Sequence, residues 1–245
     1  MGLSGRAYAW TDEKGDHFIV YYQVNENFAH ETLRNAETYY NRIAADLGYA
    51  RYSNFWQWDN RVKIYIYPTL EEFQKATGQP AWSNGMAAYS KKEIHSFNAS
   101  EGFMDGLLPH EITHLIFRDF VGIKGQIPLW LDEGVAQWEE PAKREMDKRY
   151  ARYLVKVDKE FPLYDLTYKG INDASTEEQV QAFYLQSLSL VDFLVKTYGA
   201  SSFTEFCRQL RDGKPFDDAL RSAYPNFIQD MNDLEIKWRK YVMED

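Results

Sequence analysis

A five-residue segment constrains this chain more than any other feature of its sequence. The segment is His110-Glu111-Ile112-Thr113-His114. On an α-helix, positions i and i+4 lie on one face, one turn apart, so the two imidazoles can bind a single metal ion. Glu111 would lie beside that ion without pointing at it. Apolar side chains around the segment predict that the helix is buried: Leu107, Leu108, Ile112, Leu115 and Ile116.

Pro109 leaves two possibilities for the start of this helix. Proline is favoured in the first turn of a helix, where its missing N–H costs no hydrogen bond. Inside a helix, proline removes a hydrogen bond and produces a kink. The sequence therefore predicts either a helix that starts at Pro109 or a kink immediately before His110.

A second segment supplies the third metal ligand. A catalytic zinc site usually has three protein ligands and a water, so two histidines do not complete it. Residues 128–138 (PLWLDEGVAQW) contain Glu133, which follows His114 after 18 intervening residues. That interval allows one helix to end, a glycine-containing turn, and a second helix that returns a carboxylate to the metal. Because a His₂Glu set suits Zn²⁺ and leaves one position open, we predict one Zn²⁺ per chain, held by His110, His114 and Glu133.

The two segments together carry a family resemblance. HEITH followed by WLDEGVAQW resembles the gluzincin branch of the zinc metallopeptidases, and is closest to the peptidase MA-like proteins, which are related to the catalytic domain of thermolysin and the zinc aminopeptidases. The resemblance extends from about Ser83 to Gly199, whereas the first eighty residues match only in their general α/β character. It implies a hydrolase that cleaves peptide bonds, with His110, His114 and Glu133 as zinc ligands and Glu111 as the general base.

Tyr184 is the second catalytic candidate. The segment from Phe183 to Leu190, with Tyr198-Gly199 at its far end, resembles the family helix that begins with a tyrosine stabilising the transition state. The resemblance implies that Tyr184 donates a hydrogen bond to the oxyanion. The alternative is a tyrosine of the protein core, because an apolar stripe at helical spacing includes it: Val180, Tyr184, Leu188, Val191 and Val195.

Ala87 marks a departure from the aminopeptidase pattern. Those enzymes carry a Gly-x-Met-Glu-Asn strand some 25 residues before HExxH, and residues 83–88 (SNGMAA) occupy a similar place here. Ala87 stands where the family's glutamate would hold the α-ammonium of the substrate. The departure favours an endopeptidase over an aminopeptidase. Gly85 has a second interpretation, as the residue of a simple turn.

Hydrophobic periodicity predicts a mixed α/β region followed by a mostly helical one. Strands are expected at residues 17–22, 61–67 and 91–98, helices at 28–47 and 69–77, and a loop at 79–90. After about residue 100, helical periodicity continues to the end of the chain. We therefore predict an α+β, zincin-like fold with the active site between its two lobes. One peptidase unit is expected over residues 1–245, with an α/β lobe at about 1–99 and a helical lobe at about 100–245.

Composition limits the classes of function. The chain has 245 residues and a formal net charge of −9, which argues against a nucleic-acid partner. Its 44% of hydrophobic residues exclude a disordered chain, and its single Cys207 excludes a disulfide framework. No run is apolar enough for a membrane span, and no signal peptide is visible. We expect a monomer that acts on a peptide or protein substrate; the resemblance favours an extracytoplasmic location for a chain without its signal peptide.

Some residues outside the motif have two interpretations. His95 lies in the strand expected at residues 91–98, which as an edge strand could hold an extended peptide, or it is a half-exposed surface residue. Gln137 could support the metal ligand Glu133, or be an exposed helix residue. Trp130 and Trp138 are expected to pack the second helix against the HExxH helix.

Two alternatives to an active enzyme follow from the same residues. The chain could be a catalytically silent zincin-fold protein that acts as a binding module. All four motif residues are present, which favours the enzyme. It could also be a latent protease, in which the segment before His17 covers the cleft.

Overall fold

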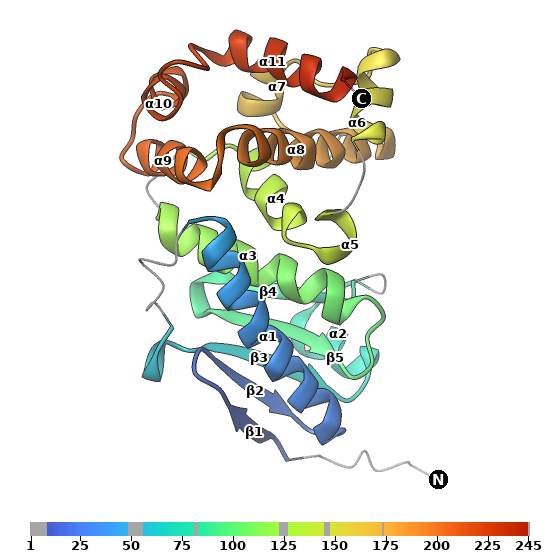
Figure 1. The fold of residues 1–245 in the computed structure, drawn as a ribbon. Helices are drawn as coiled ribbons and strands as arrows, with labels where there is room; N and C mark the ends of the chain where they lie inside the picture. The colour runs from blue at the N-terminus through green and yellow to red at the C-terminus, as the bar shows by residue number, and fades with distance from the viewer. Residues whose placement is uncertain are drawn as a thin grey trace. The chain divides into compact units, whose positions relative to one another are not determined.

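The computed structural model describes residues 9–48, 56–80, 83–122, 127–144, 148–172 and 174–244. The chain is α+β, with a five-stranded sheet in its N-terminal part and mostly helices after it (Figure 1), which confirms the predicted fold class. It divides into two compact units. The sheet unit comprises residues 1–42 and 52–115, and the helical unit comprises residues 43–51 and 116–245. The division falls inside two helices, α1 (Glu26–Asp46) and α3 (Leu108–Val121).

The sheet unit is built on five strands in the order β1-β2-β3-β5-β4. The three central strands are parallel, and the strands at either end are antiparallel to their neighbours. The strand bounds are β1 Thr11–Lys14, β2 Phe18–Tyr22, β3 Val62–Tyr67, β4 Gly85–Ala88 and β5 Glu93–Phe97. The strands expected at 17–22, 61–67 and 91–98 are therefore confirmed as β2, β3 and β5.

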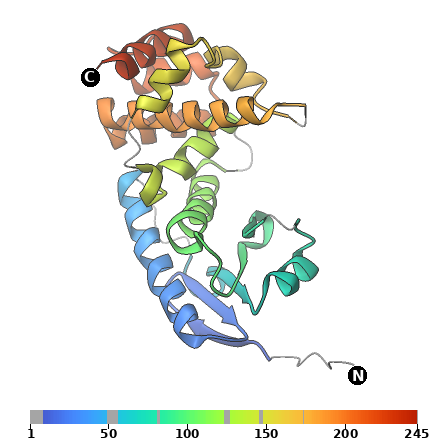
Figure 2. The ribbon, with the colours of Figure 1, turned by 90° about the vertical axis from the view of Figure 1, so that its right-hand side faces the viewer.

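One face of the sheet is the core of this unit. Along β3, Val62, Ile64 and Ile66 are buried and alternate with half-buried residues, as period 2 requires. α1 packs on this face, where Tyr40 lies edge-on to Phe18 of β2. Figure 2 shows α1 running along one side of the strands. Gly48 follows α1 with a φ of 71°, a left-handed conformation that ends the helix where the sequence predicts.

The opposite face of the sheet carries a row of aromatic rings. Tyr21, Tyr65 and His95 are cross-strand partners on β2, β3 and β5. Each ring is stacked on the next with centroids 4.9 Å apart. Near the end of β5, α2 (Leu70–Thr77) covers part of this face through Phe73, which packs against Phe97.

The loop predicted at residues 79–90 is partly wrong. Residues 85–88 form β4, the last strand of the sheet, and Tyr89–Lys91 form a 3-10 turn, η3. A short strand of small residues lacks the β-branched pattern that signals a strand, so pairing with β5 decides its conformation. The same pairing corrects the position of the edge strand. β5 lies between β3 and β4, so His95 is internal and β4 is the edge.

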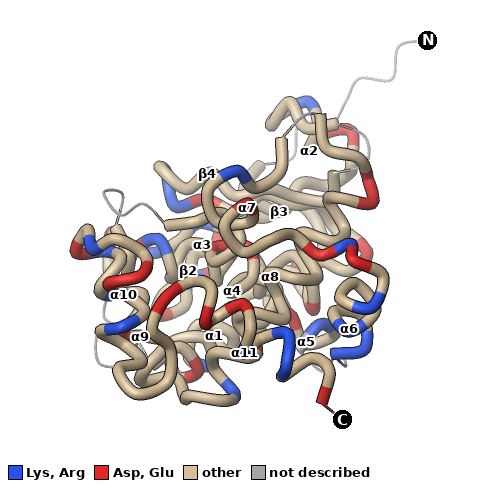
Figure 3. The backbone as a smooth tube through the Cα atoms, turned by 90° about the horizontal axis from the view of Figure 1, so that it is seen from above, with Lys and Arg blue, Asp and Glu red and all other residues tan. Residues whose placement is uncertain are grey.

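The helical unit contains eight helices among the described residues, besides the ends of α1 and α3. Their bounds are α4 Leu129–Trp138, α5 Pro141–Arg144, α6 Arg149–Lys156, α7 Leu163–Tyr168, α8 Glu177–Tyr198, α9 Ala200–Arg211, α10 Phe216–Ala223 and α11 Met231–Met243. α8 begins with a capping box, in which Thr176 accepts a hydrogen bond from the backbone N–H of Gln179 and the Gln179 side chain accepts one from Thr176. α9 and α10 each carry both acidic and basic residues (Figure 3). None of the helices in the described part of the chain is long and apolar enough to cross a membrane.

Candidate metal centre

The helix that carries both histidines begins after a π-helical turn. Gly102, with a φ of 70°, precedes this turn, η4 (Phe103–Leu107), and α3 starts directly after it at Leu108. Pro109 therefore lies in the first turn of α3, a position at which proline is favoured. The Thr113 hydroxyl donates to the Pro109 carbonyl at 2.6 Å. Of the two possibilities for Pro109, the structure has the helix start, at the junction with a π-turn.

The two imidazoles lie on one face of α3 and converge. Nε2 of His110 is 3.1 Å from Nε2 of His114, and the ring planes are 81° apart. His114 is buried and His110 is half-buried. Two ligand nitrogens at about 2.0–2.1 Å from one tetrahedral Zn²⁺ are separated by about 3.3 Å. The observed separation is close to this value, so the two Nε2 atoms are positioned to bind one ion.

Tyr89, which no sequence pattern identifies, contacts Glu111 and His114 of the HEITH segment. Its hydroxyl donates to Oε2 of Glu111 at 3.2 Å. Its ring lies edge-on to His114, with centroids 5.8 Å apart. Tyr89 directly follows the edge strand β4, so the strand that could not be predicted also determines the position of this side chain. No spacing in the sequence relates Tyr89 to residues twenty positions later.

Glu133 lies on α4, a helix that is mostly buried. From Trp130 to Trp138, every residue except Glu133 is buried. The indole N–H groups of Trp130 and Trp138 donate to Thr167 Oγ1 and to Asp192 Oδ1, both at 3.1 Å. These hydrogen bonds join α4 to α7 and α8. Glu133 is thus a half-exposed carboxylate between two tryptophans that hydrogen-bond α4 to its neighbours.

α4 and α8 approach each other closely beside Glu133. A Cβ atom on Gly134 would lie 2.5 Å from the carbonyl oxygen of Ser187, so only glycine fits there. Gln137 Nε2 donates to the carbonyl oxygen of Tyr184 at 3.1 Å and reaches that of Glu133 at 3.4 Å. Gln137 is buried, which excludes the exposed alternative, and it supports Glu133 through the backbone.

Tyr184 lies on α8, beside this contact. Its side chain is half-buried. Burial raises the pKa of the Tyr184 phenol, and the charge of Glu133 raises it further. The phenol therefore stays protonated at neutral pH and can act as a hydrogen-bond donor.

An ion pair joins the end of α3 to α4. Arg118, one turn after His114, donates to Oδ2 of Asp132 through Nη2 at 2.6 Å and through Nε at 3.1 Å. Asp132 directly precedes Glu133. This pair fixes α4 relative to the last turn of α3, and sequence analysis did not identify it. The sequence signal for this ion pair is weak. Many chains have an acidic residue next to a candidate metal ligand and a basic residue 14 positions earlier.

The three predicted ligands form one group. His110, His114 and Glu133 each offer one ligand atom, and these atoms all lie within 4.8 Å of one another. It is the only set of three or more such side chains in the described residues that could hold a metal ion. Two imidazoles and one carboxylate are a donor set that Zn²⁺ prefers, so the residues fit the ion that the sequence predicts.

His95 does not belong to this group. It stacks on Tyr65 in the aromatic row, and its Nε2 lies 3.3 Å from a carboxylate oxygen of Glu93. Burial lowers the pKa of His95, and Glu93 opposes that effect. The residue is a neutral member of a packed sheet face.

Residues 43–244 match the family model described as the Peptidase MA superfamily. Because that range covers most of the sequence, the chain belongs to the Peptidase MA superfamily, a family of metallopeptidase-like proteins that are typically zinc-dependent. The match includes both motif helices and leaves out β1, β2 and most of α1. Among curated proteins, none matches this sequence.

Proposed function

We propose that the protein is a zinc metallopeptidase of the gluzincin type, which hydrolyses internal peptide bonds. The observation that carries this proposal is the convergence of two imidazole nitrogens and the Glu133 carboxylate within 4.8 Å, with the Glu111 carboxylate beside them on α3. Membership of the Peptidase MA superfamily supports it.

In this proposal His110, His114 and Glu133 hold one Zn²⁺. When bound, the ion supplies Lewis-acid chemistry, lowering the pKa of a water towards about 7 and polarising the scissile carbonyl. Glu111 accepts the proton of the attacking water and passes it to the leaving amine. The Tyr89 hydroxyl holds Oε2 of that carboxylate, which leaves Oε1 to take the proton. The phenol of Tyr184 donates a hydrogen bond to the developing oxyanion.

Internal bonds are the expected targets because β4 lacks a carboxylate. Ala87 stands on this edge strand, at the place where the related aminopeptidases hold the α-ammonium of their substrates. β4 itself therefore offers no carboxylate to the charge of a free N-terminus. An extended polypeptide can instead add to the outer edge of β4 through backbone hydrogen bonds, with no requirement for a terminus.

The first test is metal content, measured by elemental mass spectrometry. We expect about one zinc per wild-type chain and a strong loss in Glu133→Ala, because a site of two histidines binds zinc far more weakly than one of three ligands. Glu31→Ala, an exposed glutamate of α1, is the matched control and should retain the metal. A wild-type chain that takes up no zinc after reconstitution contradicts the proposal.

The second test separates an enzyme from a silent member of the fold. Glu111→Gln should keep the zinc and lose hydrolysis of a mixed peptide library, because the amide accepts no proton. Cleavage within blocked peptides, whose N-termini are acetylated, should match cleavage of the free ones. Zinc binding without hydrolysis by the wild type would make the protein a binding module.

A further inference from the structure

The helical unit carries an exposed aromatic surface that the proposed chemistry does not use. Tyr164 and Tyr168 lie one turn apart on α7 and are 61% and 60% exposed. Their ring centroids are 4.9 Å apart, so the two rings form one continuous patch. Paired exposed aromatic rings are typical of surfaces that bind a partner, because each presents apolar area at a small cost in side-chain entropy.

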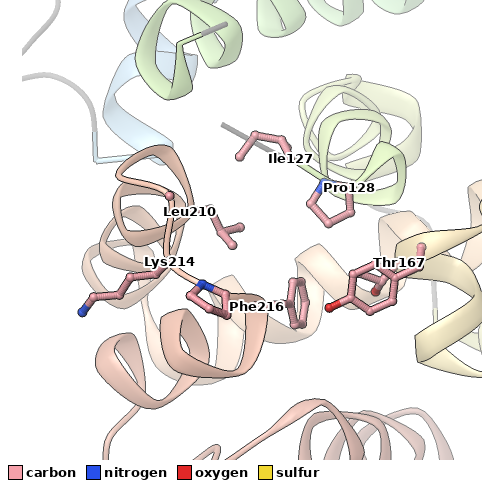
Figure 4. Close-up of a pocket in the computed structure, with 9 residues that line it drawn as sticks. Ile127, Pro128, Thr167, Leu210, Lys214 and Phe216 are labelled. Atoms are coloured by element: carbon pink, nitrogen blue, oxygen red, sulfur yellow. The ribbon is translucent and has the colours of Figure 1, made fainter. Parts of the chain in front are cut away.

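Two hollows adjoin this pair. The first, of about 620 Å³, is lined by residues from the segment that precedes α4 and from α7, α9 and α10, and its apolar side chains include Pro128, Leu210 and Phe216. Figure 4 shows these side chains pointing into the hollow, whereas Lys214 extends away from it. Lys214 donates instead to the hydroxyl of Ser222 at 3.0 Å. Tyr168 lines this hollow and also the second one.

The second hollow is acidic. It has a volume of about 430 Å³ and is lined by both tyrosines together with Asp217, Asp230 and Glu235, and no lysine or arginine is among its lining residues. One oxygen each of Asp217 and Asp230 accepts a backbone N–H, from Met231 at 2.9 Å and from Asp233 at 2.8 Å. These bonds fix the carboxylates in place, and the second oxygen of each has no hydrogen bond within the described part of the chain.

The chemistry of this hollow favours an organic cation over a metal ion. In the described residues, the ligand atoms of these three carboxylates do not converge as those of the metal centre do. Aromatic faces next to carboxylates bind lysine or arginine side chains, through cation–π contacts and charge. The apolar hollow beside it is suited to a leucine-sized side chain on the same ligand.

We propose that Tyr164, Tyr168 and the two adjoining hollows form a docking surface for a polypeptide segment that combines a lysine or arginine with a neighbouring apolar residue. The basic side chain lies between the tyrosine rings and the carboxylates of Asp217 and Asp230. The apolar side chain enters the hollow lined by Pro128, Leu210 and Phe216. Binding at this surface does not depend on the proposed hydrolysis, because none of these residues takes part in it.

The experiment measures binding of a fluorescein-labelled peptide in which lysine and leucine recur with glycine between them. Fluorescence anisotropy is recorded with Glu111→Gln protein, so that cleavage cannot consume the probe. We expect saturable binding that weakens with salt, and no binding of the same peptide with glutamate in place of lysine. The Kd should rise at least about tenfold in Tyr164→Ala/Tyr168→Ala, because two aromatic contacts are lost.

Two further variants make the outcome specific. Asp217→Asn/Asp230→Asn keeps the hydrogen bonds to the backbone, since asparagine caps a helix as well as aspartate does, and should weaken binding by a similar factor. Tyr150→Ala/Tyr153→Ala on α6 removes equally exposed rings and should bind as tightly as the parent. Equal affinities for all variants, or no anisotropy change up to about 1 mM protein, would overturn the proposal. Dimerisation of the protein that Tyr164→Ala/Tyr168→Ala abolishes would overturn it too, by placing a second copy on the surface.

Discussion

At the scale of single residues, the partial burial of Glu133 and Glu111 fits the roles proposed for these two carboxylates. The nine residues from Trp130 to Trp138 fill the interior of the helical unit except for Glu133. A carboxylate at the one position of this nine-residue run that is not buried can reach a metal ion without the full cost of burying a charge. The same logic applies to Glu111, which is half-buried and held by one hydrogen bond from Tyr89.

Tyr89→Phe tests the role of that hydrogen bond. Removing the hydroxyl leaves the Glu111 carboxylate without a donor that fixes its orientation, and a bond to a charged group is worth about 1.5–3 kcal/mol. We expect kcat to fall by about tenfold or more, while KM and zinc content stay near the wild-type values. Peptide cleavage assays and elemental analysis measure these quantities. A fall in zinc content equal to the fall in kcat would instead make Tyr89 part of the metal-binding structure.

At the scale of elements, the contact between α4 and α8 positions Glu133, the third ligand of the proposed metal site. Gly134 allows the two helices to approach, and Gln137 bonds across them to the backbone of Tyr184. The indole of Trp138 adds a hydrogen bond to Asp192 of α8. Glu133 and Tyr184 therefore belong to a single rigid pair of helices, so that a change in their packing alters both residues together.

Gly134→Ala should disturb this pair of helices. The added methyl group would lie 2.5 Å from the Ser187 carbonyl and 2.8 Å from a methyl group of Val191, and neither backbone nor core side chain can move freely. We expect a loss of about 1–3 kcal/mol in the free energy of unfolding and weaker zinc binding. Urea denaturation and metal titration measure the two effects. Unchanged stability would show that α4 and α8 can separate without cost.

At the scale of the whole molecule, buried tyrosines make stability depend on pH in the alkaline range. Burial raises the pKa of Tyr224 well above 10, and charges on Cys207 and Tyr198 add to that effect. Burial also raises the pKa of Tyr241, together with the charge of Asp192 and the hydrogen bond to it. A group whose pKa is higher in the folded state stabilises the fold fully below its unfolded pKa of about 10, and that stability is lost as pH rises above it.

Tyr224→Phe tests this dependence. In the described residues the Tyr224 hydroxyl is buried and has no hydrogen-bond partner, so its removal should leave stability at pH 7 unchanged or raise it by about 1 kcal/mol. Above pH 10 the variant should lose less stability than the wild type. The measurement is the free energy of unfolding in urea between pH 7 and pH 11, with the exposed Tyr150→Phe as control. A decline as steep as that of the wild type contradicts the assignment to Tyr224.

The sequence by itself determined the elements that have a strong local pattern. β3 alternates, α1 has helical spacing and a glycine at its end, and α2 begins at Thr69, whose hydroxyl accepts the Glu72 N–H. The convergence of His110 and His114 was predictable for the same reason, because HExxH places two imidazoles one turn apart on any α-helix. Predicting Glu133 as a ligand relied also on the family pattern. The interval after His114 allows a second helix to bring a carboxylate back to the metal, but does not require it.

Only the tertiary structure decided the features that depend on contacts between distant segments. β4 has no strand signal and becomes an edge strand through pairing with β5, and this pairing makes His95 internal. Tyr89 reaches Glu111, Arg118 reaches Asp132, and Gly134 meets Ser187 across separations that leave no periodic trace. Local propensity and periodicity act over a few residues, whereas these contacts are selected by the packing of the whole chain.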